Sequence, residues 1–283
     1  MRLPANAAPR AGWASPARLR PLAALTGPRR FLAATFTIVD LEARKLRHDP
    51  TDILTRAVQP ALWLLLFGEV FTHVRGIPTD DRPYLDFMTP GILAQSVLFI
   101  AIFYGISTIW ERDLGIVHKF LVSPAPRGAL VLGKALAAGL RGLAQAAIVY
   151  VLALVLGVHL NWHPLALLGV VALVLTGAAL FATFSLIIAC LVRTRERFMG
   201  IGQVLTMPLF FASNAIYPIA IMPAWLQVLS HLNPLTYEVD GLRALMLAGE
   251  TSAYGLGFDA LVLLGVTVVL VAVGAALYPR LGT

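Results

Sequence analysis

The chain has 283 residues, of which 58% are hydrophobic and 13% are charged. Because soluble domains average about 25% charged residues, and because an apolar surface of this extent would aggregate in water, these values exclude an ordinary soluble domain and a disordered chain. The net charge of +7 is spread over the flanks of apolar runs instead of forming one basic stripe, which indicates a membrane protein and argues against nucleic acid as a partner.

The first 30 residues form a basic, proline-rich segment without acidic side chains. We expect this segment to be flexible, to lie near anionic lipid head groups and to precede one membrane domain over residues 31–283. The pair Arg29-Arg30 resembles part of a twin-arginine export signal. Charged residues follow it where such a signal needs an apolar stretch, so we expect no export signal here.

Residues 31–47 have the pattern of an amphipathic helix. Apolar side chains recur every three or four residues, which places them on one helical face: Leu32, Phe36, Val39, Ala43 and Leu46. Charged residues occupy another face. This pattern predicts a helix lying on the membrane surface, and a helix packed on a soluble partner is the alternative.

Six apolar runs are long enough to cross a bilayer, which takes about 20 residues. They cover residues 54–74, 89–110, 130–158, 165–192, 199–217 and 258–278. A shorter apolar stretch at 219–232 is bounded and interrupted by prolines, which favours outer re-entrant helices between the fifth and sixth spans. The sequence therefore predicts an all-α membrane protein with six transmembrane helices.

The orientation follows from the basic residues that flank these runs. Counted in alternate flanks, 13 Lys and Arg residues lie on one side and three, Arg75, Arg82 and Arg243, on the other. Since positive charge is retained in the cytoplasm, we expect both termini to be cytoplasmic in a multi-pass protein of the plasma (inner) membrane.

Polar residues inside the runs form stripes. Lys134, Arg141 and Gln145 fall within about 40° of one another on the third span, at about 100° per residue. A cation at bilayer depth is costly, so Arg141 is expected either to pair structurally or to serve transport. Two further sets face protein or a translocation path, with hydrogen bonds between helices as the alternative: Gln95 and Phe99 in the second span, and Gln203, Thr206, Phe210 and Asn214 in the fifth.

Sites for catalysis, nucleotide and metal are not expected. Residues 128–135 match most of a P-loop but lack its final Ser or Thr and a preceding strand, which favours the entry to the third span. His159 and His163 have metal-ligand spacing on a helix, but Pro164 follows and no carboxylate adjoins, so positioning at the membrane interface is favoured over metal binding. Cys190 lies in an apolar run and is interpreted as a small buried hydrophobe.

Several short blocks together resemble type-2 ABC exporter permeases over residues 35–280, most closely the drug-resistance and nodulation-factor branch. They are RHDP at 47–50, QPALWLLLFG at 59–68, WERDLG at 110–115, FLVSP at 120–124, NAIYP at 214–218, MPAWL at 222–226, LNPLTY at 232–237 and DGLR at 240–243. The resemblance implies a dimer of six-helix permeases, with a second copy or a homologue as partner, bound to two cytoplasmic ABC ATPase subunits. This chain then binds no cofactor, and ATP and Mg²⁺ belong to the partner ATPase.

The resemblance also implies roles for two sets of residues. A coupling helix that docks on the ATPase maps to Glu111, Arg112, Asp113, Gly115, Lys119 and Phe120, for which a solvated run of charges is the alternative. The outer re-entrant region maps to Tyr217, Pro218, Asn233, Pro234, Tyr237, Asp240 and Arg243.

The function that follows is ATP-driven export of a hydrophobic or amphipathic substrate, by alternating access or by lateral extrusion. A drug, a lipid-linked glycan and a glycolipid all suit an apolar path with scattered amides and aromatic rings. A non-transporting membrane scaffold that recruits an ATPase for signalling is the alternative.

Overall fold

The computed structural model describes residues 27–48, 51–68, 70–71, 83–123, 125–192 and 194–282. Most of the basic N-terminal segment lies outside these ranges. So do three residues of the charge count, Arg75, Arg82 and Arg193, and the side chains of four more, Lys45, Arg47, Arg56 and Lys119.

Within the described residues the chain is helical, with one isolated β-bridge between Leu160 and Leu247. The α-helices are α2 (Gly27–His48), α3 (Thr51–Leu62), α5 (Tyr84–Asp113), α6 (Ile116–Val122), α7 (Arg127–Val155), α8 (Pro164–Leu191), α9 (Arg195–Phe211), α10 (Ala224–Leu232), α11 (Pro234–Met246) and α12 (Leu256–Leu277). Shorter elements are the π-helix η2 (Trp63–Gly68) and the 3₁₀-helices η3 (Ile219–Ile221) and η4 (Tyr278–Gly282).

Four of the six expected spans lie in helices long and apolar enough to cross a bilayer, namely α5, α7, α8 and α12 with η4. The other two expected spans are shorter. α3 has 12 residues and continues into the six-residue η2, and α9 has 17 residues with Pro208 inside it. The all-α membrane class is confirmed, and a total of six spans stays a prediction.

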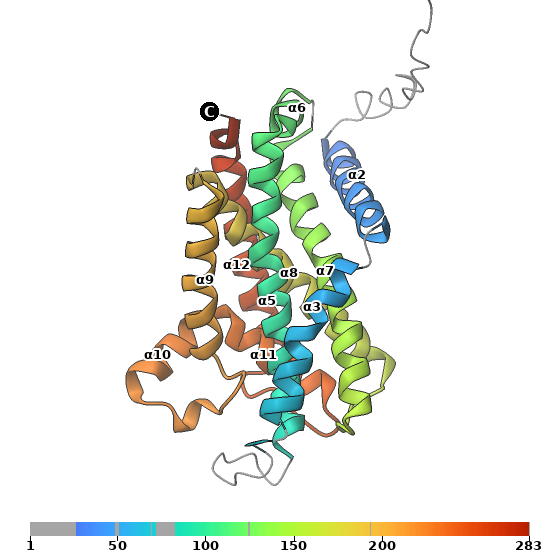
Figure 1. The fold of residues 1–283 in the computed structure, drawn as a ribbon, viewed down its shortest axis with the longest axis vertical. Helices are drawn as coiled ribbons and strands as arrows, with labels where there is room; N and C mark the ends of the chain where they lie inside the picture. The colour runs from blue at the N-terminus through green and yellow to red at the C-terminus, as the bar shows by residue number, and fades with distance from the viewer. Residues whose placement is uncertain are drawn as a thin grey trace, which may run out of the picture.

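Helix α5 forms the centre of the bundle, because most of its apolar residues are buried between other helices. It packs on α7, α8, α9, α11 and on η2, and Figure 1 shows α5 running through the middle of the bundle. Small residues allow the close approach. A Cβ at Gly91 would overlap the backbone of Ala215, and one at Gly142 of α7 would touch Val174 of α8 at 3.3 Å.

Helix α2 begins at Gly27, earlier than expected, and packs along the outside of α7 (Figure 1). The face against α7 carries Ala34, Thr35, Ile38 and Glu42, all buried. The predicted apolar stripe is a different face, where Phe36 is 66% exposed. A helix over residues 31–47 is confirmed, with Leu32 and Phe36 of its apolar stripe exposed, and its position on the membrane surface stays a prediction.

The connections gather at two ends of the bundle. Helix α6, the start of α9 and the C-terminal η4 lie at one end, and α10 and α11 lie at the other, where α9 finishes (Figure 1). The stretch between α9 and α12 thus holds the 3₁₀-helix η3 and two short α-helices, α10 and α11, at one end of the molecule. Their re-entrant placement in a membrane stays a prediction.

Candidate functional site

Two adjoining cavities lie along one face of α5, and together we call them the α5 groove. The larger has a volume of about 640 Å³ and the smaller of about 160 Å³, and Ile100 and Phe103 line both. The larger is lined by Ile100, Phe103, Tyr104, Ile106, Ser107, Trp110, Glu111, Leu114, Ile116 and Arg141. The smaller is lined by Gln59, Pro60, Ser96, Phe99, Ile100, Phe103 and Gln145.

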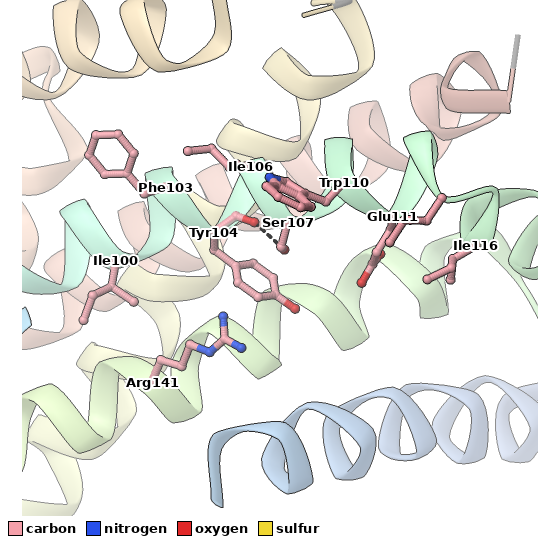
Figure 2. Close-up of a pocket in the computed structure, with 10 residues that line it drawn as sticks. Ile100, Phe103, Tyr104, Ile106, Ser107, Trp110, Glu111, Ile116 and Arg141 are labelled. Carbon is pink, nitrogen blue, oxygen red and sulfur yellow. Dashed lines mark hydrogen bonds between the residues drawn. The ribbon is translucent and has the colours of Figure 1, made fainter. Parts of the chain in front are cut away.

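The groove follows from the helical repeat of α5. Its lining residues recur every three or four positions from Ser96 to Leu114, so they project from one side of successive turns (Figure 2). Helices α3 and α7 supply the other walls, and α6 supplies Ile116. The lining is mainly aliphatic and aromatic with few polar groups, the composition typical of a small-molecule site.

The charged groups of the groove are paired within the chain. The guanidinium of Arg141, on α7, donates to the Glu42 carboxylate of α2 at 3.2 Å and lies 4.8 Å from the centre of the Tyr104 ring (Figure 2). Glu111, at the end of α5, forms an ion pair with Lys134 of α7. Arg141 is thus paired, as a buried charge requires, and its side chain also lines the groove, so the choice between structural pairing and a transport role stays a prediction.

Two polar side chains of the groove have buried polar atoms without a hydrogen-bond partner among the described residues, namely the Tyr104 hydroxyl and the Gln145 amide. Gln145 is 1% exposed, and neither its amide nitrogen nor its amide oxygen has a hydrogen-bond partner among the described residues. Leaving such a group unsatisfied costs about 1 to 3 kcal/mol. The three residues of the predicted stripe on the third span therefore have different environments. Lys134 and Arg141 form ion pairs, whereas Gln145 lines the smaller cavity.

The predicted coupling residues lie together at the end of the bundle that holds α6, the start of α9 and η4, which we call the α6 end. Several of them, however, contact other residues of this chain. Glu111 turns inward to Lys134. Arg112 donates to the Val192 carbonyl at 3.2 Å, and Asp113 accepts from Arg195 of α9 at 2.8 Å. Gly115 has φ 69°, a left-handed turn that suits glycine and starts α6. Phe120 packs beside Val117, Tyr278 and Leu281.

The sequence did not single out the partners of this charged end. The Arg195 guanidinium lies 3.8 Å from the centre of the Trp110 ring while it also binds Asp113, so α5 and α9 are joined at one point. The surface exposed here includes apolar side chains, with Leu114 at 68% and Val122 at 87%, beside exposed charged residues such as Arg127 and Arg197. A docking role for this end stays a prediction.

The path candidates do not gather at one place. Phe99 lines the smaller cavity, whereas Gln95 is buried in α5 and belongs to neither cavity. On α9, Gln203 is exposed and Thr206 is buried, its hydroxyl donating to the Gly202 carbonyl. Phe210 packs edge-on against Trp63, with ring centres 5.7 Å apart. Asn214 lies beyond the end of α9, where its carbonyl accepts from Arg243 at 2.8 Å.

The outer residues brace the short helices against one another. Asn233 caps α11 at the Leu235 amide and donates to the Leu209 carbonyl at 2.7 Å, and Pro234 opens α11. Two tyrosine hydroxyls donate to backbone carbonyls: Tyr217 to Phe211 at 2.5 Å and Tyr237 to His231 at 2.7 Å. The Asp240 carboxylate accepts from the Ser252 hydroxyl at 2.8 Å, and the Arg243 guanidinium lies 4.0 Å from the centre of the Phe87 ring. Pro218 directly precedes η3. These contacts indicate a structural role.

Of the paired histidines noted in the sequence, His159 lies 2.9 Å from the Asp86 carboxylate through its Nδ1 atom. Residues 161–163 are not helical, so the helical ligand spacing does not form. In the ranges that the structure describes, no three His, Cys, Asp or Glu side chains gather as a metal site.

The long apolar helices and the exposed stripe of α2 define an all-α integral membrane protein. Residues 33–247 match the ABC-2 type transporter family. The chain therefore belongs to that family, and it is a transport permease. The resemblance read from its sequence blocks is confirmed.

Several curated relatives carry the same class of name. The chain is 30% identical to the transport permease ycf38 of Cyanophora paradoxa over 76% of this chain and 74% of the relative. It is 27% identical to the daunorubicin resistance ABC transporter permease protein DrrB1 of Streptomyces coeruleorubidus, over 90% and 88%. It is also 27% identical to nodulation protein J of Sinorhizobium fredii, over 69% and 74%.

Proposed function

We propose that this permease exports a hydrophobic or amphipathic molecule, such as a drug, a lipid or a glycolipid, with energy from separate ATPase subunits. The observation that carries the proposal is the α5 groove, whose larger cavity of about 640 Å³ reaches from the bundle interior to Glu111 and Ile116 beside α6. That volume lies in the range of small-molecule sites, roughly 300 to 1,000 Å³. The name of the DrrB1 relative, which refers to drug resistance, agrees with such a substrate.

The α6 end is the proposed docking surface for the ATPase. Helix α6 is short, follows α5 directly and precedes α7. A displacement of α6 by the ATPase is therefore transmitted to α5 and α7, which both line the groove. ATP and Mg²⁺ bind in the ATPase, and closure of its two subunits moves α6. Such coupling requires two conformations of the groove that the bound ATPase distinguishes.

We further propose the placement in the membrane. Arg112, Arg127, Arg195, Arg197 and Arg280 belong to the α6 end, which supports a cytoplasmic position for it under the positive-inside rule. Residues 31–283 form the membrane domain, with α3–η2 and α9 as the first and fifth spans. Helices α10 and α11 then lie at the outer surface of the plasma (inner) membrane.

The test is transport into inside-out vesicles that contain the permease and its ATPase. ATP is expected to drive accumulation of a fluorescent amphipathic dye, and a hydrolysis-deficient ATPase is the matched control. Recruitment of the ATPase without ATP-driven movement across a broad panel of drugs, lipids and glycolipids would favour the scaffold alternative.

A further inference from the structure

The α5 groove combines an apolar body with polar groups of two kinds. Its two charged side chains are already matched, Arg141 by Glu42 and Glu111 by Lys134. Its smaller cavity is lined by Gln145, which is buried and has neither its N–H nor its carbonyl oxygen paired within the described residues, and its larger cavity is lined by Tyr104, whose hydroxyl is likewise unpaired there. A site of this kind offers hydrogen bonds and carries no net charge of its own.

We propose that the α5 groove binds an uncharged amphipathic molecule, whose hydrogen-bonding group engages Gln145 and whose apolar body lies along Phe103, Tyr104 and Trp110. This ligand class deepens the proposed export function and rests on it. The site is formed within one permease chain, by α3, α5, α6 and α7.

The polar end of the ligand is placed by the smaller cavity. Gln59 of α3 and Ser96 of α5 line it together with Gln145. The Ser96 hydroxyl donates to the Ile92 carbonyl at 2.7 Å, so its oxygen remains able to accept a hydrogen bond. A hydroxyl, amide or uncharged diarylamine therefore finds both donors and acceptors, which a purely hydrocarbon ligand leaves unsatisfied.

A charged ligand is disfavoured by the same arrangement. An anion must compete with Glu42 for Arg141, whose guanidinium donates to that carboxylate at 3.2 Å. A cation must compete with Lys134 for Glu111, and Lys134 also donates to the Thr108 hydroxyl at 3.2 Å. Neither ion finds an unpaired counter-charge among the residues that line the cavity. The free energy lost on desolvating the ion in an apolar cavity then exceeds the free energy gained from its contacts.

Two fluorescent probes test the charge preference directly. N-phenylnaphthylamine is neutral with one N–H donor, and anilinonaphthalene sulfonate has the same ring system with an added anionic group. Each is titrated against the full permease in lipid nanodiscs without ATPase, and binding to empty discs of the same lipid is subtracted. The neutral probe is expected to bind at least about tenfold more tightly after that correction, and equal affinity or tighter binding of the sulfonate overturns the proposal.

Two variants test the residues. Gln145→Leu keeps the side-chain volume and is expected to weaken the neutral probe about threefold to tenfold, the range of one lost hydrogen bond. Glu42→Gln leaves the charge of Arg141 unmatched and is expected to strengthen the sulfonate relative to the neutral probe. Gln227→Leu on α10, whose amide donates to the Met222 carbonyl outside the groove, is the matched control and leaves both affinities unchanged. Unchanged probe affinities in both groove variants overturn the proposal.

The outcomes separate the ligand class from export itself. The binding comparison on the unaltered permease needs neither a variant that folds nor an ATPase. ATP-driven transport together with a preference for the sulfonate rejects the neutral class and retains export. A neutral, Gln145-dependent site without ATP-driven transport of any probe retains the site and rejects its use in export.

Discussion

The ion pair between Lys134 and Glu111 joins α7 to α5 at the mouth of the groove. Both side chains are largely buried, at 7% and 12% exposure, so removal of one partner leaves the other as an uncompensated buried charge. Such losses are typically about 3 to 5 kcal/mol, whereas removal of both charges together is often nearly neutral.

We therefore expect Lys134→Met to lower the free energy of unfolding by about 3 to 5 kcal/mol, and Lys134→Met with Glu111→Gln to recover most of that loss. Thermal unfolding of the detergent-purified permease measures both. The Glu111→Gln single variant completes the cycle. Equal unfolding temperatures for the Lys134→Met single variant and the unaltered protein would contradict the assignment.

Glu238 of α11 is a second buried group at this scale. It is fully buried, and both carboxylate oxygens are without a hydrogen-bond partner in the described structure. A Cβ at Gly177 of α8 would overlap this carboxylate, so the glycine makes room for it. Burial raises the pKa of Glu238 well above its ordinary value of 4.5.

This direction gives a sign to the pH dependence. Since the folded state holds the Glu238 proton more tightly than the unfolded state, its stability falls as the pH rises from about 4.5 toward the folded pKa. Glu238→Gln mimics the protonated side chain and is expected to flatten that fall. Unfolding temperatures from pH 4.5 upward measure the slope, and an identical slope in the variant would remove Glu238 as its source.

At the scale of elements, α6 links α5 to α7, and among its described side chains the apolar Val122 is exposed, at 87%. An exposed apolar residue on a short helix is suited to entering a groove on a partner. Arg112 and Asp113 are instead engaged with Val192 and Arg195. The apolar tip is therefore the better candidate for direct contact with the ATPase.

We expect Val122→Asp to lower the amount of ATPase that co-purifies with the permease about tenfold, the effect of about 1.4 kcal/mol. Thr251→Asp, in the exposed loop at the opposite end, is the control and should retain the ATPase. Quantified co-purification from membranes measures both. If the Val122→Asp permease co-purifies with as much ATPase as the unaltered permease, Val122 is not part of the docking surface. Charged residues such as Arg112 and Asp113 would then be the candidates for contact with the ATPase.

Sequence periodicity predicted the elements well where one pattern dominated. The runs at 89–110, 130–158, 165–192 and 258–278 fall in long apolar helices, since twenty apolar residues have no other stable arrangement in a bilayer. It also located the amphipathic stripe of α2. The boundary of α2 was less accurate, because Gly27 and Pro28 are compatible with a helix start as well as with a loop.

The candidate site was predictable only in part, because pairing across helices depends on tertiary packing. The stripe of Lys134, Arg141 and Gln145 stays a prediction as a functional set, and nothing in the local sequence indicates that Glu42, 99 residues away, meets Arg141. Similarly, Trp110 and Arg195 come together only after α8 returns the chain to the α6 end.

For the whole molecule, the two ends of the bundle give a topology test. With both termini in the cytoplasm, the loop before α12 lies outside the cell, and Thr251 is exposed in that loop. A Thr251→Cys variant in a Cys190→Ala background should react with an impermeant maleimide on intact cells. Arg127→Cys at the start of α7 is the matched control and should react only after permeabilisation, and the reverse pattern would invert the orientation.

The last prediction concerns a second copy of the chain. Helix α9 exposes Gln203 together with Val204, Met207 and Phe211. An amide facing hydrocarbon lipid is unsatisfied, and the helix lies at the edge of the bundle, so a protein surface is the better neighbour for this face. Gln203→Cys in the Cys190→Ala background is therefore expected to form a disulfide-linked dimer in membranes under mild oxidation. Val268→Cys, exposed on α12, is the control for random collision, and equal cross-linking of the two variants would place α9 against lipid.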